Sequence, residues 1–181
     1  LLLLRVQIRG EEFYDRSCHE EMHVIGHVAT EEYKTFGEAF VAGNADCQNG
    51  YYHGVVEEYV GTKSPNTLTG EQLRNFCDAV PASRAEPDRA LNCAHGIGHA
   101  LVYMYRTPIS LPLARCADLS TDAFRAECIA GAFMQYGFVG QEPDAKLGAT
   151  TTRAVFECTN MLRNRDACWL ALSARTITSG D

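Results

Sequence analysis

The sequence predicts an all-α fold of repeated helical hairpins, arranged as a solenoid-like or closed helical array and stapled by local disulfides. Apolar residues recur at three- and four-residue spacing, and no stretch shows the alternation that is typical of half-buried strands. Eight cysteines, an even number, follow one another in closely spaced pairs. A histidine-bearing pattern also recurs along the chain, which indicates a repeat architecture.

The repeated pattern is clearest in residues 92–105, NCAHGIGHALVYMY. Its core, His95-Gly-Ile-Gly-His99-Ala, recurs earlier in the chain as His23-Val-Ile-Gly-His27-Val. We therefore expect two helices that present paired histidines at equivalent points.

A third copy of the pattern is centred on His53. Cys47 precedes His53 by six residues, as Cys93 precedes His99. In every copy a tyrosine follows six residues after the last histidine: Tyr33, Tyr59 and Tyr105. These tyrosines are expected to pack in the core with hydrogen-bonded hydroxyl groups.

Length and composition favour one all-α domain spanning residues 1–181. An apolar content of 46% is enough to bury a core. Histidine-bearing units occupy about residues 10–106, and histidine-free capping units about residues 111–175. The chain begins with four leucines and not with Met. We therefore expect a processed or trimmed chain, such as the outer part of a larger membrane-anchored protein.

The charge balance argues against nucleic acid as a partner. The net charge is -7 and the pI is near 5.3, and Lys and Arg form no cluster along the sequence. A basic amphipathic face for membrane attachment is also absent from the sequence, so the charge itself names no partner.

The order of the cysteines predicts four local disulfides. The expected pairs are Cys18 with Cys47, Cys77 with Cys93, Cys116 with Cys128, and Cys158 with Cys168. Such disulfides imply an extracytoplasmic location: secreted, periplasmic or on the outer face of a membrane. The alternative, in which some thiolates bind metal, has less support because no Cys-x-x-Cys occurs.

Three helices are expected before residue 61. Residues 10–30 carry an apolar stripe at helical spacing, and a second helix should run from Glu31 to Ala42. Gly43-Asn44 should end this helix as a left-handed stop. Asp46 should then cap a third helix, which begins at Cys47 and runs to about Val60.

A loop over residues 61–70 separates these helices from the central part of the chain. A helix from Glu71 to Val80 follows, and then the helix that contains residues 92–105. Asn92 is expected to cap or kink this helix, and TPISLP at 107–112 breaks the chain again.

The remaining residues repeat the scaffold without histidines. The expected hairpins are 113–119 with 122–138, and 151–162 with 166–173. Gly131 falls three residues after Cys128, as Gly50 falls after Cys47. In this register Met134 occupies the place of His53.

The histidines predict a metal site where the units meet. Residues four apart on a helix lie on one face about 5–6 Å apart, so each His-x-x-x-His pair can serve one ion. The expected ligands are His23, His27, His53, His95 and His99, with His19 as the least regular member. Glu57 is expected to act as a ligand or as a catalytic base.

Glycines beside these histidines support convergence of the helices. Gly26, Gly54 and Gly98 lie within predicted helices, where glycine costs about 1 kcal/mol relative to alanine. Close approach of neighbouring helices is the simplest reason for this recurring cost.

The functional prediction is an extracytoplasmic metalloenzyme with a transition-metal cofactor, Cu, Fe or Zn. The ligands exceed the four that a single ion needs, so the set could hold one site of mixed ligands or two sites close together. An oxidoreductase that acts on a small-molecule substrate is slightly favoured over a hydrolase. The alternative is a non-catalytic helical repeat domain that binds a partner or stores metal.

Two further alternatives concern particular histidines. The segment His19-Glu20-Glu21-Met22-His23 matches the HExxH pattern and resembles the zincin metalloproteases, in which two histidines bind zinc and the glutamate is the general base. The match covers five residues only. Non-covalent bis-histidine haem ligation also stays open, whereas c-type attachment is excluded because no Cys-x-x-Cys-His occurs.

Overall fold

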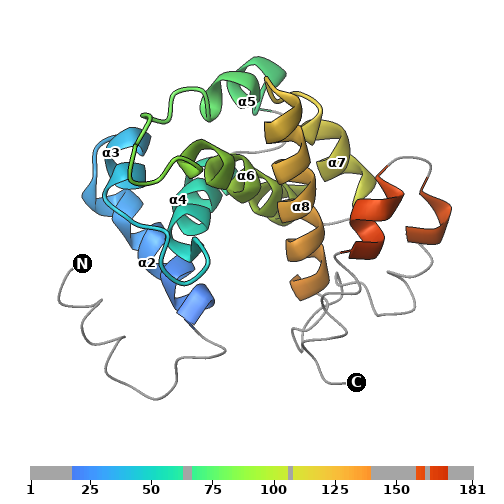
Figure 1. Ribbon diagram of the computed structural model, residues 1–181, viewed down its shortest axis with the longest axis horizontal. Helices are drawn as coiled ribbons and strands as arrows, with labels where there is room; N and C mark the ends of the chain where they lie inside the picture. The colour runs from blue at the N-terminus through green and yellow to red at the C-terminus, as the bar shows by residue number, and fades with distance from the viewer. Residues whose placement is uncertain (1–17, 63–66, 106–107, 140–157, 162–163, 171–181) are drawn as a thin grey trace.

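The computed structural model describes residues 18–62, 67–105, 108–139, 158–161 and 164–170, and these residues form helices and connecting turns with no strand (Figure 1). The helices are α2 (Cys18–Glu32), α3 (Phe36–Val41), α4 (Gly50–Gly61), α5 (Gly70–Phe76), α6 (Arg89–Tyr105), α7 (Ser110–Cys116) and α8 (Asp122–Val139). Short helical turns follow at 158–160 and 165–170. The all-α prediction is confirmed. None of the described helices is long and apolar enough to cross a membrane.

Four helices form the body of the fold, because α2 packs on α4, α4 on α6, and α6 on α8 (Figure 1). α3 covers one flank of α2 and α4, and α7 packs against α6 and α8. The order of these helices along the chain is therefore also their order in space. A solenoid-like or closed array and the single-domain assignment stay predictions.

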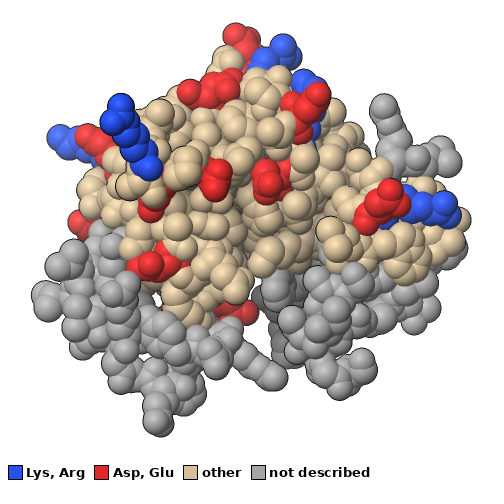
Figure 2. All heavy atoms as spheres, in the orientation of Figure 1, with Lys and Arg blue, Asp and Glu red and all other residues tan. Residues whose placement is uncertain are grey.

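The distribution of charged side chains on the surface agrees with the acidic composition. Asp and Glu side chains are spread over the face shown in Figure 2, whereas Lys and Arg stand at its margins. This distribution fits the net charge of -7.

All four predicted disulfides are present. They join Cys18 to Cys47, Cys77 to Cys93, Cys116 to Cys128, and Cys158 to Cys168. Each bond fastens the end of one helix or turn to the next packed segment. No cysteine is free, so thiolate metal ligands are ruled out. Four disulfides indicate an oxidising, extracytoplasmic location.

Glycines allow the backbones of α2 and α4 to touch. A Cβ atom on Gly26 would collide with the carbonyl oxygen of Tyr51, and one on Gly54 with the carbonyl oxygen of His23. The predicted close approach of these helices is confirmed, and it places the histidines of α2 beside those of α4.

The crossing of α6 and α8 has the same register. Gly98 of α6 faces the carbonyl oxygen of Cys128, and Gly131 of α8 faces the carbonyl oxygen of His95. In both crossings, each helix thus has a glycine pressed against the partner's backbone.

This register corrects the predicted equivalence of Met134 with His53. Gly131 faces the carbonyl oxygen of His95, and Gly54 faces that of His23; each of these is the first histidine of a repeated pair. Gly50 instead faces the carbonyl oxygen of His19, which lies outside the pair. Gly131 is therefore the structural equivalent of Gly54 and not of Gly50. Counting three residues onward from Gly131 and from Gly54 places Met134 at the level of Glu57. The second crossing therefore has an apolar side chain where the first has a carboxylate.

The expected helix over 31–42 is wrong because the chain breaks within it. α2 continues to Glu32, and α3 begins after Thr35. The Thr35 hydroxyl accepts a hydrogen bond from the Glu38 amide, and the Glu38 carboxylate accepts one from the Thr35 amide. This reciprocal capping box starts a new helix at Phe36.

The left-handed stop at Gly43-Asn44 and the cap at Asp46 are also wrong. The left-handed residues are instead Cys47, Gln48 and Asn49, with φ of 53°, 56° and 65°. α4 therefore begins at Gly50, three residues later than predicted. Gly43 has a different role, since a Cβ there would overlap the ring of Tyr51.

Both ends of α5 and the expected cap at Asn92 also differ from prediction. α5 begins after Thr69, which forms a capping box with Gln72, and it ends at Phe76 and not at Val80. Asn92 lies inside α6 without capping it, and its side-chain amide donates to Asn49 Oδ1 at 2.9 Å.

α7 begins at Ser110, before its predicted start at residue 113. Pro112 is tolerated because it lies in the first turn, where backbone amides have no helical acceptor. α8 matches prediction to within one residue at its C-terminal end. Of the predicted hairpin 151–162 with 166–173, only 158–161 and 166–170 lie among the described residues.

The contact of Gly54 with the backbone of α2 predicts that a larger residue at this position lowers stability. Gly54→Ala should lower the free energy of unfolding by about 1–3 kcal/mol, because the new methyl group overlaps the His23 backbone. Gly37→Ala is the matched control, since a Cβ on this helical glycine meets nothing within 4 Å. The control should be neutral or up to about 1 kcal/mol more stable. Denaturant unfolding measures both, and equal stability of the two variants would contradict the proposed packing.

Candidate metal centre

The six histidines lie on three helices that pack side by side: His19, His23 and His27 on α2, His53 on α4, and His95 and His99 on α6. Five of the rings are in mutual contact. Their centroids are 4.6 Å apart for His19–His23, 5.2 Å for His19–His53, 5.3 Å for His23–His53, 5.6 Å for His23–His99, 4.9 Å for His53–His95, 4.7 Å for His53–His99 and 5.1 Å for His95–His99. The predicted convergence of imidazoles is therefore found in the fold.

His19 and His23 turn their Nε2 atoms toward each other at 3.0 Å. The Nδ1 atom of His19 donates to the carbonyl oxygen of Cys47 at 2.9 Å, which fixes the proton on Nδ1 and leaves a lone pair on Nε2. The Nδ1 atom of His23 donates to Glu57 Oε2 at 2.9 Å, with the same consequence. Two lone pairs that face each other at this distance repel unless a proton or a metal ion lies between them.

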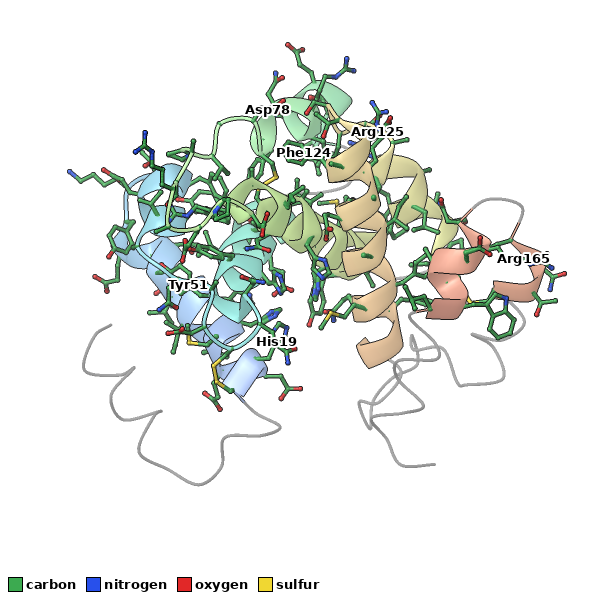
Figure 3. All side chains as sticks on the ribbon, viewed as in Figure 1. His19, Tyr51, Asp78, Phe124, Arg125 and Arg165 are labelled. Carbon is green, nitrogen blue, oxygen red and sulfur yellow. A yellow bond between two sulfur atoms is a disulfide. The ribbon has the colours of Figure 1, made fainter. Side chains whose placement is uncertain are left out.

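The Cys47 carbonyl is positioned by the left-handed turn before α4. Three successive non-glycine residues in this conformation cost on the order of 1–2 kcal/mol each. The Cys18–Cys47 disulfide holds the turn against the start of α2, next to His19. Figure 3 shows His19 at this end of α2, on the inner side of the molecule.

Glu57 is a buried carboxylate that collects three imidazoles. Its Oε2 accepts from His23 Nδ1 and from His27 Nε2 at 3.0 Å, and its Oε1 lies 3.4 Å from His99 Nδ1. Burial would raise the pKa of Glu57, but the hydrogen bonds from His23, His27 and His99 outweigh burial and lower the pKa. The carboxylate is therefore ionised at neutral pH. The hydrogen bond to Glu57 likewise raises the pKa of His27.

His53 and His99 are the deepest rings, with exposed fractions of 3% and 1%. Burial and the neighbouring imidazoles lower the pKa of His53 well below its usual value, and burial lowers the pKa of His99 to about 4. Both rings are thus neutral at pH 7. His53 Nδ1 and His99 Nε2 have no hydrogen-bond partner among the described residues. An unpaired buried nitrogen costs about 1–3 kcal/mol, which a bound metal ion would offset.

Four of the rings have an oxygen acceptor on Nδ1, which is the arrangement that orients metal-bound histidines. The acceptor is a carbonyl for His19, a carboxylate for His23, and Gln135 Oε1 at 2.9 Å for His99. His95 Nδ1 lies 3.3 Å from Glu127 Oε2, and this contact lowers the pKa of Glu127.

Two groups of ligand atoms are compact enough to hold an ion. They are His19, His23 and His53, and His23, Glu57 and His99; the ligand atoms within each group lie within 4.8 Å of one another. Among the predicted ligands, His95 joins these groups through ring contacts with His53 and His99. His27 contacts Glu57 Oε2 and has 40% of its side chain exposed.

Sequence reasoning missed the two α8 residues, Gln135 and Glu127, that hold the α6 histidines. Gln135 is 6% exposed and is the only strongly polar residue in the apolar run Gly131–Val139. A polar side chain in such a run was the available indication of a buried hydrogen bond.

The peptidase and haem alternatives both meet geometric obstacles. His19 and His23 do converge, but Glu20 is exposed, and the carboxylate that contacts His23 is Glu57. For haem, ring centroids only 4.6–5.6 Å apart leave no room for a porphyrin between two imidazoles.

The lowered histidine pKa values predict acid sensitivity of the metal-free protein. Burial lowers the pKa of His19, His53 and His99, so the unfolded chain binds protons more strongly than the folded chain below about pH 6.5. The free energy of unfolding should therefore fall between pH 7 and pH 5. The raised pKa of His27 acts in the opposite direction, but only one ring contributes to it.

His99→Gln tests this assignment because the ring faces His23, His53, His95, Glu57 and Gln135. The full shift of His99 corresponds to on the order of 3 kcal/mol, of which about 2 kcal/mol lies between pH 7 and pH 5. Thermal unfolding across this range should show a weaker pH dependence in the variant than in the wild type. Parallel curves would contradict the buried neutral state of His99.

Comparison of the chain with protein-family models, with curated proteins and with solved structures finds no match. The chemistry of the histidine cluster must therefore be argued from its geometry.

Proposed function

We propose that this protein is an extracytoplasmic metal-binding protein whose principal site consists of His19, His23 and His53. The observation that carries the proposal is the pair of Nε2 atoms on His19 and His23, 3.0 Å apart, with both Nδ1 atoms already hydrogen-bonded to oxygen. Metal–nitrogen bonds of about 2.0–2.1 Å bring two adjacent ligand nitrogens to about 3 Å from each other.

The donor set favours a borderline transition metal. Neutral imidazoles suit Cu(II) and Zn(II), whereas Mg²⁺ and Ca²⁺ prefer oxygen ligands. Burial keeps the His53 ring neutral, so its nitrogens need not lose a proton before binding an ion at neutral pH.

The site also has the form of a catalytic centre, which favours a metalloenzyme as the second candidate function. Three protein ligands leave a coordination position open for water or substrate. His19 and His23 are only half-buried, so a small molecule can reach this side of the site. Copper or iron would support an oxidoreductase and zinc a hydrolase. A storage or partner-binding role uses the same ligands without turnover.

Metal affinity tests the principal site. Protein purified without chelator should bind Cu(II) and Zn(II), and His19→Gln and His53→Gln should each weaken binding by at least tenfold, because each removes one of three ligands. Glu20→Gln is the matched control, since Glu20 is exposed on the same helix. Competition titration with a chromogenic chelator measures the affinity. Unchanged affinity in both histidine variants, with native circular dichroism, would contradict the site.

The Glu20→Gln variant also tests the alternative in which the protein is a zinc peptidase. A zincin mechanism requires Glu20 as the general base, so peptide cleavage by the zinc-loaded protein should vanish in Glu20→Gln. We expect equal peptide cleavage by the wild type and by Glu20→Gln, because the Glu20 side chain is exposed and Glu57 is the carboxylate at His23. Cleavage of a fluorogenic peptide library is measured for the wild type and for Glu20→Gln. Loss of cleavage in the variant would support the zinc peptidase, and equal cleavage would contradict it.

A further inference from the structure

We propose that the histidine cluster holds two metal ions and that His23 is the ligand they share. This inference rests on the proposed metal-binding function and adds a second site to it. The second site consists of His23, Glu57 and His99, whose ligand atoms lie within 4.8 Å of one another.

His23 stands between the two sets of ligands with one nitrogen toward each. Its Nε2 faces His19 Nε2 at 3.0 Å, and its Nδ1 faces Glu57 Oε2 at 2.9 Å. The two nitrogens of an imidazole diverge, so they cannot bind one ion together. The ions are thus separated by the width of one ring, and the Nδ1 proton of His23 passes to solvent when the second ion binds.

The second set differs in charge from the first, because it contains an ionised carboxylate. Glu57 is only 6% exposed; its Oε2 accepts from His23 and His27, and its Oε1 lies 3.4 Å from His99 Nδ1. A buried carboxylate is stabilised by a cationic partner. A divalent ion beside Glu57 supplies that partner, and the carboxylate partly offsets the repulsion between the two ions.

Further donors complete the second site. His27 Nε2 lies 3.0 Å from Glu57 Oε2, so it can act as a fourth ligand once its proton passes to solvent. His99 Nδ1 lies 3.4 Å from Glu57 Oε1; to bind the ion through Nδ1, the ring moves its proton to Nε2, which has no partner among the described residues, and gives up the hydrogen bond to Gln135 Oε1. A set of imidazoles and one carboxylate suits Cu(II), Zn(II) and Fe(II). The first site, by contrast, has imidazole donors alone.

The register of the two helix crossings explains why the second ion belongs on the α2 side. At the α6–α8 crossing, Met134 occupies the level of Glu57, and His99 Nδ1 is met by the neutral amide of Gln135. A carboxylate buried among the rings is therefore supplied only by α4 among the described helices.

Metal stoichiometry tests the inference. The full chain is loaded with Cu(II) alone, freed of excess ion and analysed by elemental mass spectrometry and electron paramagnetic resonance. We expect two copper ions per wild-type chain and a resonance signal weakened by magnetic coupling through the His23 ring. Glu57→Gln should bind one ion with a full signal, because the amide oxygen still accepts from His23 Nδ1 but the carboxylate ligand is gone. His19→Gln should also bind one ion, and the double variant none.

The outcomes distinguish the two proposals. One ion per wild-type chain, unchanged in Glu57→Gln, overturns the shared site and leaves the principal site intact. Absence of bound copper in the wild type overturns the proposed function itself. Two ions with uncoupled spectra overturn the role of His23 as the bridge. Should Glu57→Gln fail to fold, as judged by circular dichroism, the wild-type stoichiometry and coupling still decide.

Discussion

The backbone contact of α2 with α4 is the constraint on which the rest of the site depends. Gly26 and Gly54 remove the side chains that would hold these helices apart, and the carbonyl oxygen of His23 lies in the space that a Cβ on Gly54 would fill. At this separation His23 and His53 place their ring centroids 5.3 Å apart. Helices spaced by ordinary side chains, 8–10 Å between axes, would pack other residues at the crossing and spread the rings.

A disulfide and a strained turn add to the glycine contact in positioning the histidines of α2. The Cys18–Cys47 bond fastens the first turn of α2 to the left-handed residues before α4. Its consequence is chemical as well as mechanical, because the Cys47 carbonyl then accepts the Nδ1 proton of His19. One covalent bond thus sets the tautomer of a ring in the cluster, and the local backbone strain is maintained by that bond and by the helix packing around it.

The buried carboxylate of Glu57 makes the two sides of the histidine cluster chemically different. Two equivalent helix crossings carry paired histidines, yet only the first presents a carboxylate at this level, while Met134 takes the place in the second. His95 and His99 depend instead on Glu127 and Gln135 of α8. The imidazoles are alike in sequence pattern but differ in acceptor, burial and charge, which is how one cluster can offer two dissimilar sets of metal ligands.

The sequence by itself determined the helical class, the disulfide pairs and the residue types of the site. Helical periodicity, the spacing of cysteines and the recurrence of histidine with glycine are local properties, and local properties can be read along the chain. Boundaries depended on capping contacts such as those of Thr35 and Thr69, which a periodic pattern does not encode.

Only the tertiary structure decided which atoms meet. The turn of Cys47 to Asn49, the acceptor on each ring and the level of Met134 depend on how helices distant in sequence are pressed together. The position of a hydrogen bond across a helix crossing follows from register and rotation of the two helices, and these are set by packing over the whole contact. The histidines could therefore be named from the sequence, whereas the division of roles among them could not.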